Sequence, residues 1–136
     1  MKFIPAGEII GDAHQVRTVT IASSSQLPDG EYCFVDMYCS DPSCDCRKTM
    51  IQVLHSGEVV SIINYGWESP SYYKQWFGDD QDEDVPQMHG ASIDITSPDK
   101  VSRKGMLGLF NALLDKRWIG AFREHYKAVK NELTGK

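Results

Sequence analysis

The sequence predicts an α+β fold, in which a four-stranded antiparallel meander in the N-terminal half packs with a short helix and with one long broken helix or two helices at the C-terminal end. Two observations predict it. Runs rich in β-branched and aromatic residues fill the first half between turn signals, and apolar residues at helical spacing fill the second. A chain of 136 residues with 41% hydrophobic content is long enough for one core. We therefore expect a single domain over 1–136, β-rich over 1–66 and helical over 67–136.

Four segments have the composition of strands. They cover residues 14–22, 31–39, 48–55 and 58–65. A breaker-rich run separates the first two strands, and Ser56 with Gly57 forms a two-residue connection, typical of a hairpin, between the last two. Because consecutive strands usually pair, we expect an antiparallel meander.

Helical signals begin after the fourth strand. Ser69 followed by Pro70 matches a helix N-cap and first helical position, and predicts a short helix over 70–77. The run Ser97-Pro-Asp repeats this pattern and predicts the start of a C-terminal helical region. Apolar residues recur there at three- and four-residue spacings: Leu107, Phe110, Leu113, Leu114 and Trp118. Because Asp115 can cap a second helix, the sequence is compatible both with one long broken helix and with two packed helices.

Two segments between these elements have unusual composition. Six aromatic residues fall within 65–77, a density that favours a plug at the edge of the core, with a binding platform as the alternative. The acidic run 79–84 (DDQDED) lacks the spacing of a calcium loop and predicts a solvated loop. Its alternative function is a docking strip for a basic partner.

The strongest chemical signal lies between the second and third strands. Cys39, Cys44 and Cys46 fall within eight residues, and thiolates bind Zn²⁺ at about 2.3 Å. If the two strands pair, Cys39 and Cys46 lie at the base of the loop and Cys44 reaches inward from it. The sequence therefore predicts a thiolate metal site with zinc as the cofactor. Cys33 lies about 20 Å from Cys39 on an extended strand, so we expect it in the core.

The fourth ligand has to come from another segment. His125 is the first candidate, because it lies on the apolar stripe that the C-terminal helix should lay against the sheet. The alternative interpretation is a half-buried histidine hydrogen-bonded to backbone or to a carboxylate. His89, in a loop beside Gly90, is a weaker candidate, and a water molecule in an open position is a further alternative. His55 would lie about 30 Å away at the far end of the hairpin.

His14 is a second candidate for the fourth ligand, on a different argument. If the first two strands pair with residue 22 opposite residue 31, His14 lies opposite Cys39 at the base of the cysteine loop. This argument depends on the register of one strand pair.

These observations predict a small soluble zinc-binding domain with a structural thiolate site, which acts as a protein-interaction module. Three thiolates with a fourth protein ligand form a closed site, and closed zinc sites are structural. The alternative is a thiol- or zinc-dependent enzyme that uses the same cysteine loop. Arg47 and Lys48 favour that alternative by lowering the pKa of a neighbouring thiol, whereas Asp41 and Asp45 oppose it.

Charge and hydropathy restrict the partners and the compartment. The formal net charge of −5 disfavours a nucleic-acid backbone as the partner, which leaves a protein partner as the expectation. The chain has neither an N-terminal apolar run typical of a signal peptide nor the roughly 20 apolar residues that cross a bilayer. We therefore expect no membrane contact and a cytoplasmic location.

Overall fold

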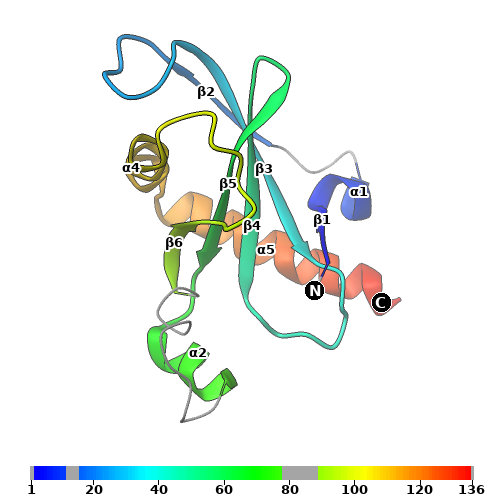
Figure 1. The fold of residues 1–136 in the computed structure, drawn as a ribbon. Helices are drawn as coiled ribbons and strands as arrows, with labels where there is room; N and C mark the ends of the chain where they lie inside the picture. The colour runs from blue at the N-terminus through cyan, green and yellow to red at the C-terminus, as the bar shows by residue number, and fades with distance from the viewer. Residues whose placement is uncertain (1, 12–15, 78–88, 136) are drawn as a thin grey trace.

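The computed structural model describes residues 2–11, 16–77 and 89–135 and confirms the α+β fold, with helices packed on an antiparallel sheet (Figure 1). The strands of the sheet are β1 (Phe3–Pro5), β2 (Arg17–Ile21), β3 (Gly30–Cys39), β4 (Lys48–His55), β5 (Glu58–Gly66) and β6 (Gly90–Ile93). The helices are α1 (Ala6–Ile10), α2 (Pro70–Phe77), α4 (Arg103–Leu113) and α5 (Lys116–Leu133). None of these helices is long and apolar enough to cross a bilayer.

The predicted meander forms the middle of the sheet. Strands β2, β3, β4 and β5 pair with their neighbours in chain order, and all the pairs are antiparallel. Two short strands, β1 and β6, extend the sheet and were not predicted, because three or four residues are too few to show an alternating pattern. Strand β6 lies in the part predicted to be helical, and α1 lies in the part predicted to be β-rich.

The connection between β4 and β5 confirms the predicted hairpin. Ser56 and Gly57 have φ angles of 52° and 82°, and two successive positive values are typical of a type I′ turn, whose twist matches that of the strands.

His55, at the end of β4, also explains why residue 30 is a glycine, which has a φ of +129°. A Cβ atom there would lie 2.8 Å from the ring of His55, so this position has no room for a side chain.

Local capping sets where α2 and α5 begin. The Ser69 hydroxyl accepts a hydrogen bond from the Tyr72 amide at 3.2 Å, which confirms the predicted start of α2. The Asp115 carboxylate accepts from the Trp118 amide at 2.8 Å and caps α5. The C-terminal region therefore contains two helices, which decides between the two alternatives.

The predicted start of the C-terminal helical region at 97–99 is wrong. Helix α4 begins six residues after Ser97, and its N-cap is Ser102, whose hydroxyl accepts from the Gly105 amide at 2.9 Å. The Ser97 hydroxyl instead accepts a hydrogen bond from the amide of Ile62 on β5 at 2.9 Å. Ser97, whose neighbours along the chain match a helix N-cap, therefore accepts a hydrogen bond from a backbone amide of the sheet instead.

Helix α5 follows β3 along one face of the sheet (Figure 1). Trp118 meets Phe34 with ring centroids 5.6 Å apart, and Tyr126 meets Tyr38 at 6.3 Å. Because alternate residues of a strand face the same side, the side chains of β3 meet successive turns of the helix. The C-terminal half of α5 therefore lies at the end of β3, where the cysteine loop begins.

Candidate metal centre

The structure brings the three predicted cysteines together. Cys39 is the last residue of β3, Cys44 lies in the loop and Cys46 lies two residues before β4. The antiparallel pairing of β3 with β4 folds the connection back on itself, so the three sulfur atoms lie within 4.8 Å of one another. This arrangement confirms that residues 39–46 form a cluster that can hold a metal ion.

Two of the three thiols are enclosed by the protein. Cys39 and Cys46 have no exposed surface, whereas Cys44 is partly exposed. The buried pair packs with Ala6 on α1 and with Val129 on α5. The cluster therefore has a closed side beneath the helices and one edge, at Cys44, that reaches the surface.

Backbone amides are directed at the sulfur atoms. The Asp41 amide donates to the Cys39 sulfur at 3.4 Å. The backbone amides of Cys46 and Lys48 act in the same direction on the next two thiols, each offsetting part of the effect of burial on the pKa of Cys44 and Cys46 respectively. In all three cases the amide belongs to the second residue after the cysteine. Such N–H donors stabilise the thiolate form, which is the form that binds a metal.

In the absence of a cation, burial keeps the Cys44 and Cys46 thiols protonated. Burial and the neighbouring thiols raise the pKa of Cys46 to about 12, and burial also raises the pKa of Cys44. The expected lowering of a thiol pKa by Arg47 and Lys48 is therefore wrong for these two cysteines. A divalent cation reverses the balance, because its charge deprotonates a coordinating thiol. The cluster is better suited to holding a soft metal than to reacting as a free thiolate.

The structure gives His125 a different neighbour from the one predicted. Its Nδ1 lies 2.7 Å from the Oδ2 of Asp36, a carboxylate on β3 whose side chain is 6% exposed. The same carboxylate accepts a hydrogen bond from the Tyr38 hydroxyl at 2.5 Å. His125 is half-buried and carboxylate-bound, as the alternative interpretation expected, and it is not among the residues whose ligand atoms gather at the thiols.

His89 and His55 also lie apart from the three sulfurs. The Nδ1 of His89 is 2.6 Å from the carbonyl oxygen of Glu68, and His55 lies at the far end of the hairpin as predicted. His14 lies outside the described residues. The register argument for it is wrong, however, because Cys39 is paired with Phe3 of β1, and β2 pairs with β3 two residues out of the expected register. Cys33 lies elsewhere on β3 and is not part of the cluster.

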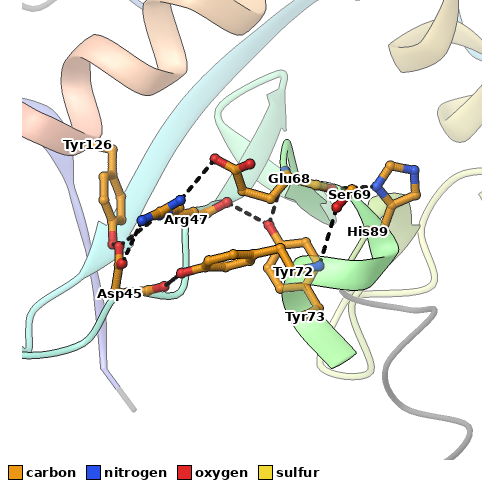
Figure 2. A network of polar contacts seen from close by, with 8 residues as sticks. All are labelled: Asp45, Arg47, Glu68, Ser69, Tyr72, Tyr73, His89 and Tyr126. Atoms are coloured by element: carbon orange, nitrogen blue, oxygen red, sulfur yellow. Dashed lines mark hydrogen bonds and ion pairs between the residues drawn. The ribbon is translucent and has the colours of Figure 1, made fainter. Parts of the chain in front are cut away.

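A network of polar contacts ties the cysteine loop to α2 and α5 (Figure 2). The Arg47 guanidinium pairs with Asp45 at 2.9 Å and with Glu68 at 3.4 Å, and it lies 4.5 Å from the ring centroid of Tyr72. The Tyr73 hydroxyl donates to the Arg47 carbonyl at 2.7 Å. Arg47 has a φ of 49°, a left-handed conformation that these contacts hold in place.

The aromatic segment 65–77 contributes to both the core and this network. Tyr65 and Tyr73 are buried and Trp67 packs against the core, which confirms the predicted plug for these three residues. Tyr72 is partly exposed and donates its hydroxyl to the carbonyl of Asp45. The acidic run 79–84 lies outside the described residues.

Sequence reasoning missed two residues of α5 that hold the loop. The Lys130 ammonium donates to the carbonyl oxygens of Cys39 at 3.1 Å and Asp41 at 2.7 Å. The Tyr126 hydroxyl lies 3.1 Å from a carboxylate oxygen of Asp45. Both residues lie close to His125 on the helix, so the apolar stripe predicted for the C-terminal helix indicated this face of α5. Spacing along the helix does not show, however, that this face meets the cysteine loop.

Comparisons of the chain with protein-family models, with curated proteins and with solved structures find no significant match. The function is therefore inferred from the site itself. Its features are three convergent sulfurs, an amide donor on the Cys39 sulfur, and a loop held by a lysine and by a polar network.

Proposed function

We propose that the chain is a zinc-binding domain in which Cys39, Cys44 and Cys46 hold a structural ion. The observation that carries this proposal is the convergence of three sulfurs within 4.8 Å. Thiolate sulfurs bound to one tetrahedral Zn²⁺ lie about 3.8 Å apart, as follows from bonds of about 2.3 Å. The cluster therefore needs only a small contraction to bind the ion. Zinc is the proposed metal because it accepts thiolate ligands and is not a redox centre.

The proposed role of the ion is to fasten the connection between β3 and β4. This connection meets α1 and α5 through the buried cysteines and α2 through Tyr72 and Tyr73. Three helices that are distant in the sequence thus meet at one loop. An ion that fixes the loop would stabilise their packing, since metal-binding free energy adds to folding free energy when the unfolded chain has no formed site.

We further propose that the domain is a cytoplasmic protein-interaction module that uses the surface of this loop. Asp41, Pro42 and Ser43 are exposed on a loop whose base is buried, an arrangement in which a rigid scaffold presents a surface for recognition. Pro42→Arg and Ser43→Arg would change this surface without removing a thiol. If the proposal holds, these variants keep their metal and lose partners that the unmodified protein captures from its own cell extract. Equal capture by the variants would contradict it.

The experiment that tests the metal site combines elemental mass spectrometry with a thiol count on protein purified without a metal-affinity column. We expect about one zinc per chain, and we expect the three clustered thiols to become titratable only after a chelator is added. Cys33, which lies apart from the cluster, is a built-in reference for an uncoordinated thiol. Protein without metal whose clustered thiols react without chelator would overturn the proposal.

One observation favours the second candidate, a zinc- or thiol-dependent enzyme. Cys44 lies at the edge of a surface cleft of about 400 Å³ that is also lined by Lys127 and Lys130. Within the described residues, no histidine or carboxylate joins the three sulfurs. A metal ion whose fourth position opened to this cleft would have an exchangeable ligand, which is typical of catalytic zinc. X-ray absorption spectroscopy distinguishes the candidates: a water oxygen in the fourth position supports the enzyme, and a fourth protein ligand supports the structural site.

A further inference from the structure

A second cleft lies at the opposite end of α5 from the thiols. It has a volume of about 360 Å³ and lies between the N-terminal half of α5 and strands β2, β3 and β4. Apolar side chains line much of it, including Phe34 and Phe122, which are almost fully buried. Val16, a large apolar residue that is 42% exposed, lies at its edge. A cleft of this size and lining is typical of a small-molecule site.

Two arginines give this cleft a positive side. The guanidinium of Arg17, on β2, lies 4.7 Å from the ring centroid of Trp118 and donates to the carbonyl of Leu113 at 3.4 Å. Arg117 is exposed on the first turn of α5. Over residues 2–11, 16–77 and 89–135, neither arginine has a carboxylate within ion-pair distance. Both guanidinium groups therefore have donors available to a ligand.

The carboxylates that line the same cleft are held by other groups. Asp115 caps α5 by accepting from the Trp118 amide at 2.8 Å. Asp36 accepts from the Tyr38 hydroxyl and lies 2.7 Å from His125. Their negative charges offset the positive charges of the arginines, although among the described residues neither acid forms an ion pair with Arg17 or Arg117. A ligand with a single negative charge fits this balance, whereas the two charges of a phosphate monoester would be repelled by both acids.

We propose that this cleft binds a small organic carboxylate, with its carboxylate group held by Arg17 and Arg117. A guanidinium presents parallel N–H donors that match the two oxygens of a carboxylate. The apolar body of the ligand lies against Phe34, Phe122 and the edge of Trp118. This site is independent of the thiol cluster, since the two share no lining residue.

The test is a titration of the isotope-labelled protein with sodium benzoate, followed by two-dimensional NMR. Benzamide, which has the same ring without the charge, is the control ligand. We expect saturable shifts of the Trp118 indole signal and of the amides near Arg117 with benzoate, and no saturable shift there with benzamide. Comparable binding of both ligands would overturn the proposal, because the arginines would then play no part.

Arg117→Gln is the decisive variant, and Arg123→Gln is its matched control on the same helix. Both residues are exposed, so neither change should disturb the fold, and Arg123 does not line this cleft. We expect Arg117→Gln to weaken benzoate binding about tenfold, the effect of losing one charge-assisted contact. The control should bind as the unmodified protein does. Unchanged binding by Arg117→Gln, or benzoate shifts confined to residues 39–47, would overturn the proposal.

Binding of inorganic phosphate is the second test of the ligand class, because arginines bind phosphates as well as carboxylates. We expect phosphate to bind the cleft more weakly than benzoate and not to displace it at equal concentration. Tighter binding of phosphate, lost in Arg117→Gln, would show that the cleft is an oxyanion site and that the carboxylate assignment is wrong.

Discussion

The two ends of α5 carry different kinds of site. At the C-terminal end, Cys39 and Cys46 are fully buried, and Lys130 fastens the loop that carries them. At the N-terminal end, a cleft of about 360 Å³ is bordered by Arg117, which is exposed, and by Arg17. The first site contains the Cys46 thiol, whose pKa burial raises to about 12, and the second contains two guanidinium groups. Burial thus suits one end to a metal ion and exposure suits the other to an anion.

Asp36 and His125 lie between these ends. The carboxylate is buried on β3, and its contact with His125 joins the middle of α5 to the sheet. Both residues also line the cleft at the N-terminal end. Breaking contacts at the thiol end and at this midpoint shows how much each contributes to the stability of the fold.

The largest effect is expected at the thiol cluster. Cys46→Ser removes one of three thiolates from a site whose zinc-binding free energy is of the order of 10–16 kcal/mol. We expect the metal affinity to fall about a thousandfold, which corresponds to ~4 kcal/mol. A chelator competition titration measures it. Cys33→Ser is the control and should keep its metal, since Cys33 lies outside the cluster. Equal metal affinity in the two variants would refute the site.

The next effect is expected at the midpoint. Asp36→Ala leaves the Tyr38 hydroxyl and the His125 ring without their carboxylate, and we expect the free energy of unfolding to fall by about 3 kcal/mol. Urea unfolding measures it. Asp36→Asn, which keeps the size and one acceptor oxygen, should lose less. A loss below ~1 kcal/mol in the alanine variant would show that this contact does not join helix and sheet as described.

A smaller effect is expected from the lysine that fastens the loop. Lys130→Met keeps the apolar stem and removes two charge-assisted hydrogen bonds to loop carbonyls. We expect a loss of about 1–2 kcal/mol in the free energy of unfolding. Lys127→Met is the matched control, because the Lys127 ammonium lies 3.9 Å from the carboxylate of Glu124 on its own helix and such exposed pairs contribute little. Similar losses in both variants would mean that Lys130 acts only as a surface charge.

The smallest effect is expected at Tyr126. Tyr126→Phe keeps the ring packed and removes the hydroxyl contacts with the Cys44 carbonyl at 3.3 Å and Asp45 at 3.1 Å. We expect a loss of about 1 kcal/mol by urea unfolding. Tyr65→Phe is the control, since the Tyr65 hydroxyl has no hydrogen-bond partner among the residues that the structure describes, and it should change stability by less than ~0.5 kcal/mol. If Tyr126→Phe lowered the free energy of unfolding as little as the control does, the contacts of the Tyr126 hydroxyl with the loop would contribute no stability beyond the packing of the ring.

The two sites also differ in how far the sequence reveals them. The three cysteines lie in one short segment between two strands, so the local chain brings them together once the hairpin forms. The cleft draws residues from β2, β3, β4 and α5, and nothing in the local sequence of Arg17 or Arg117 relates one to the other. A site is readable from sequence when its ligands are close along the chain, because few conformations can then separate them.

The sequence by itself determined the α+β class, the meander, the cap at Ser69 and the thiol cluster, because each depends on alternation, helical spacing or contacts over a few residues. Only the tertiary structure decided that Phe3 lies opposite Cys39, that Ser97 bonds to the sheet instead of capping a helix, and that His125 meets Asp36. The physical reason is that a donor or an imidazole can be satisfied by several partners of similar strength. The choice among them follows from strand register and helix direction, which are set by the packing of the whole core.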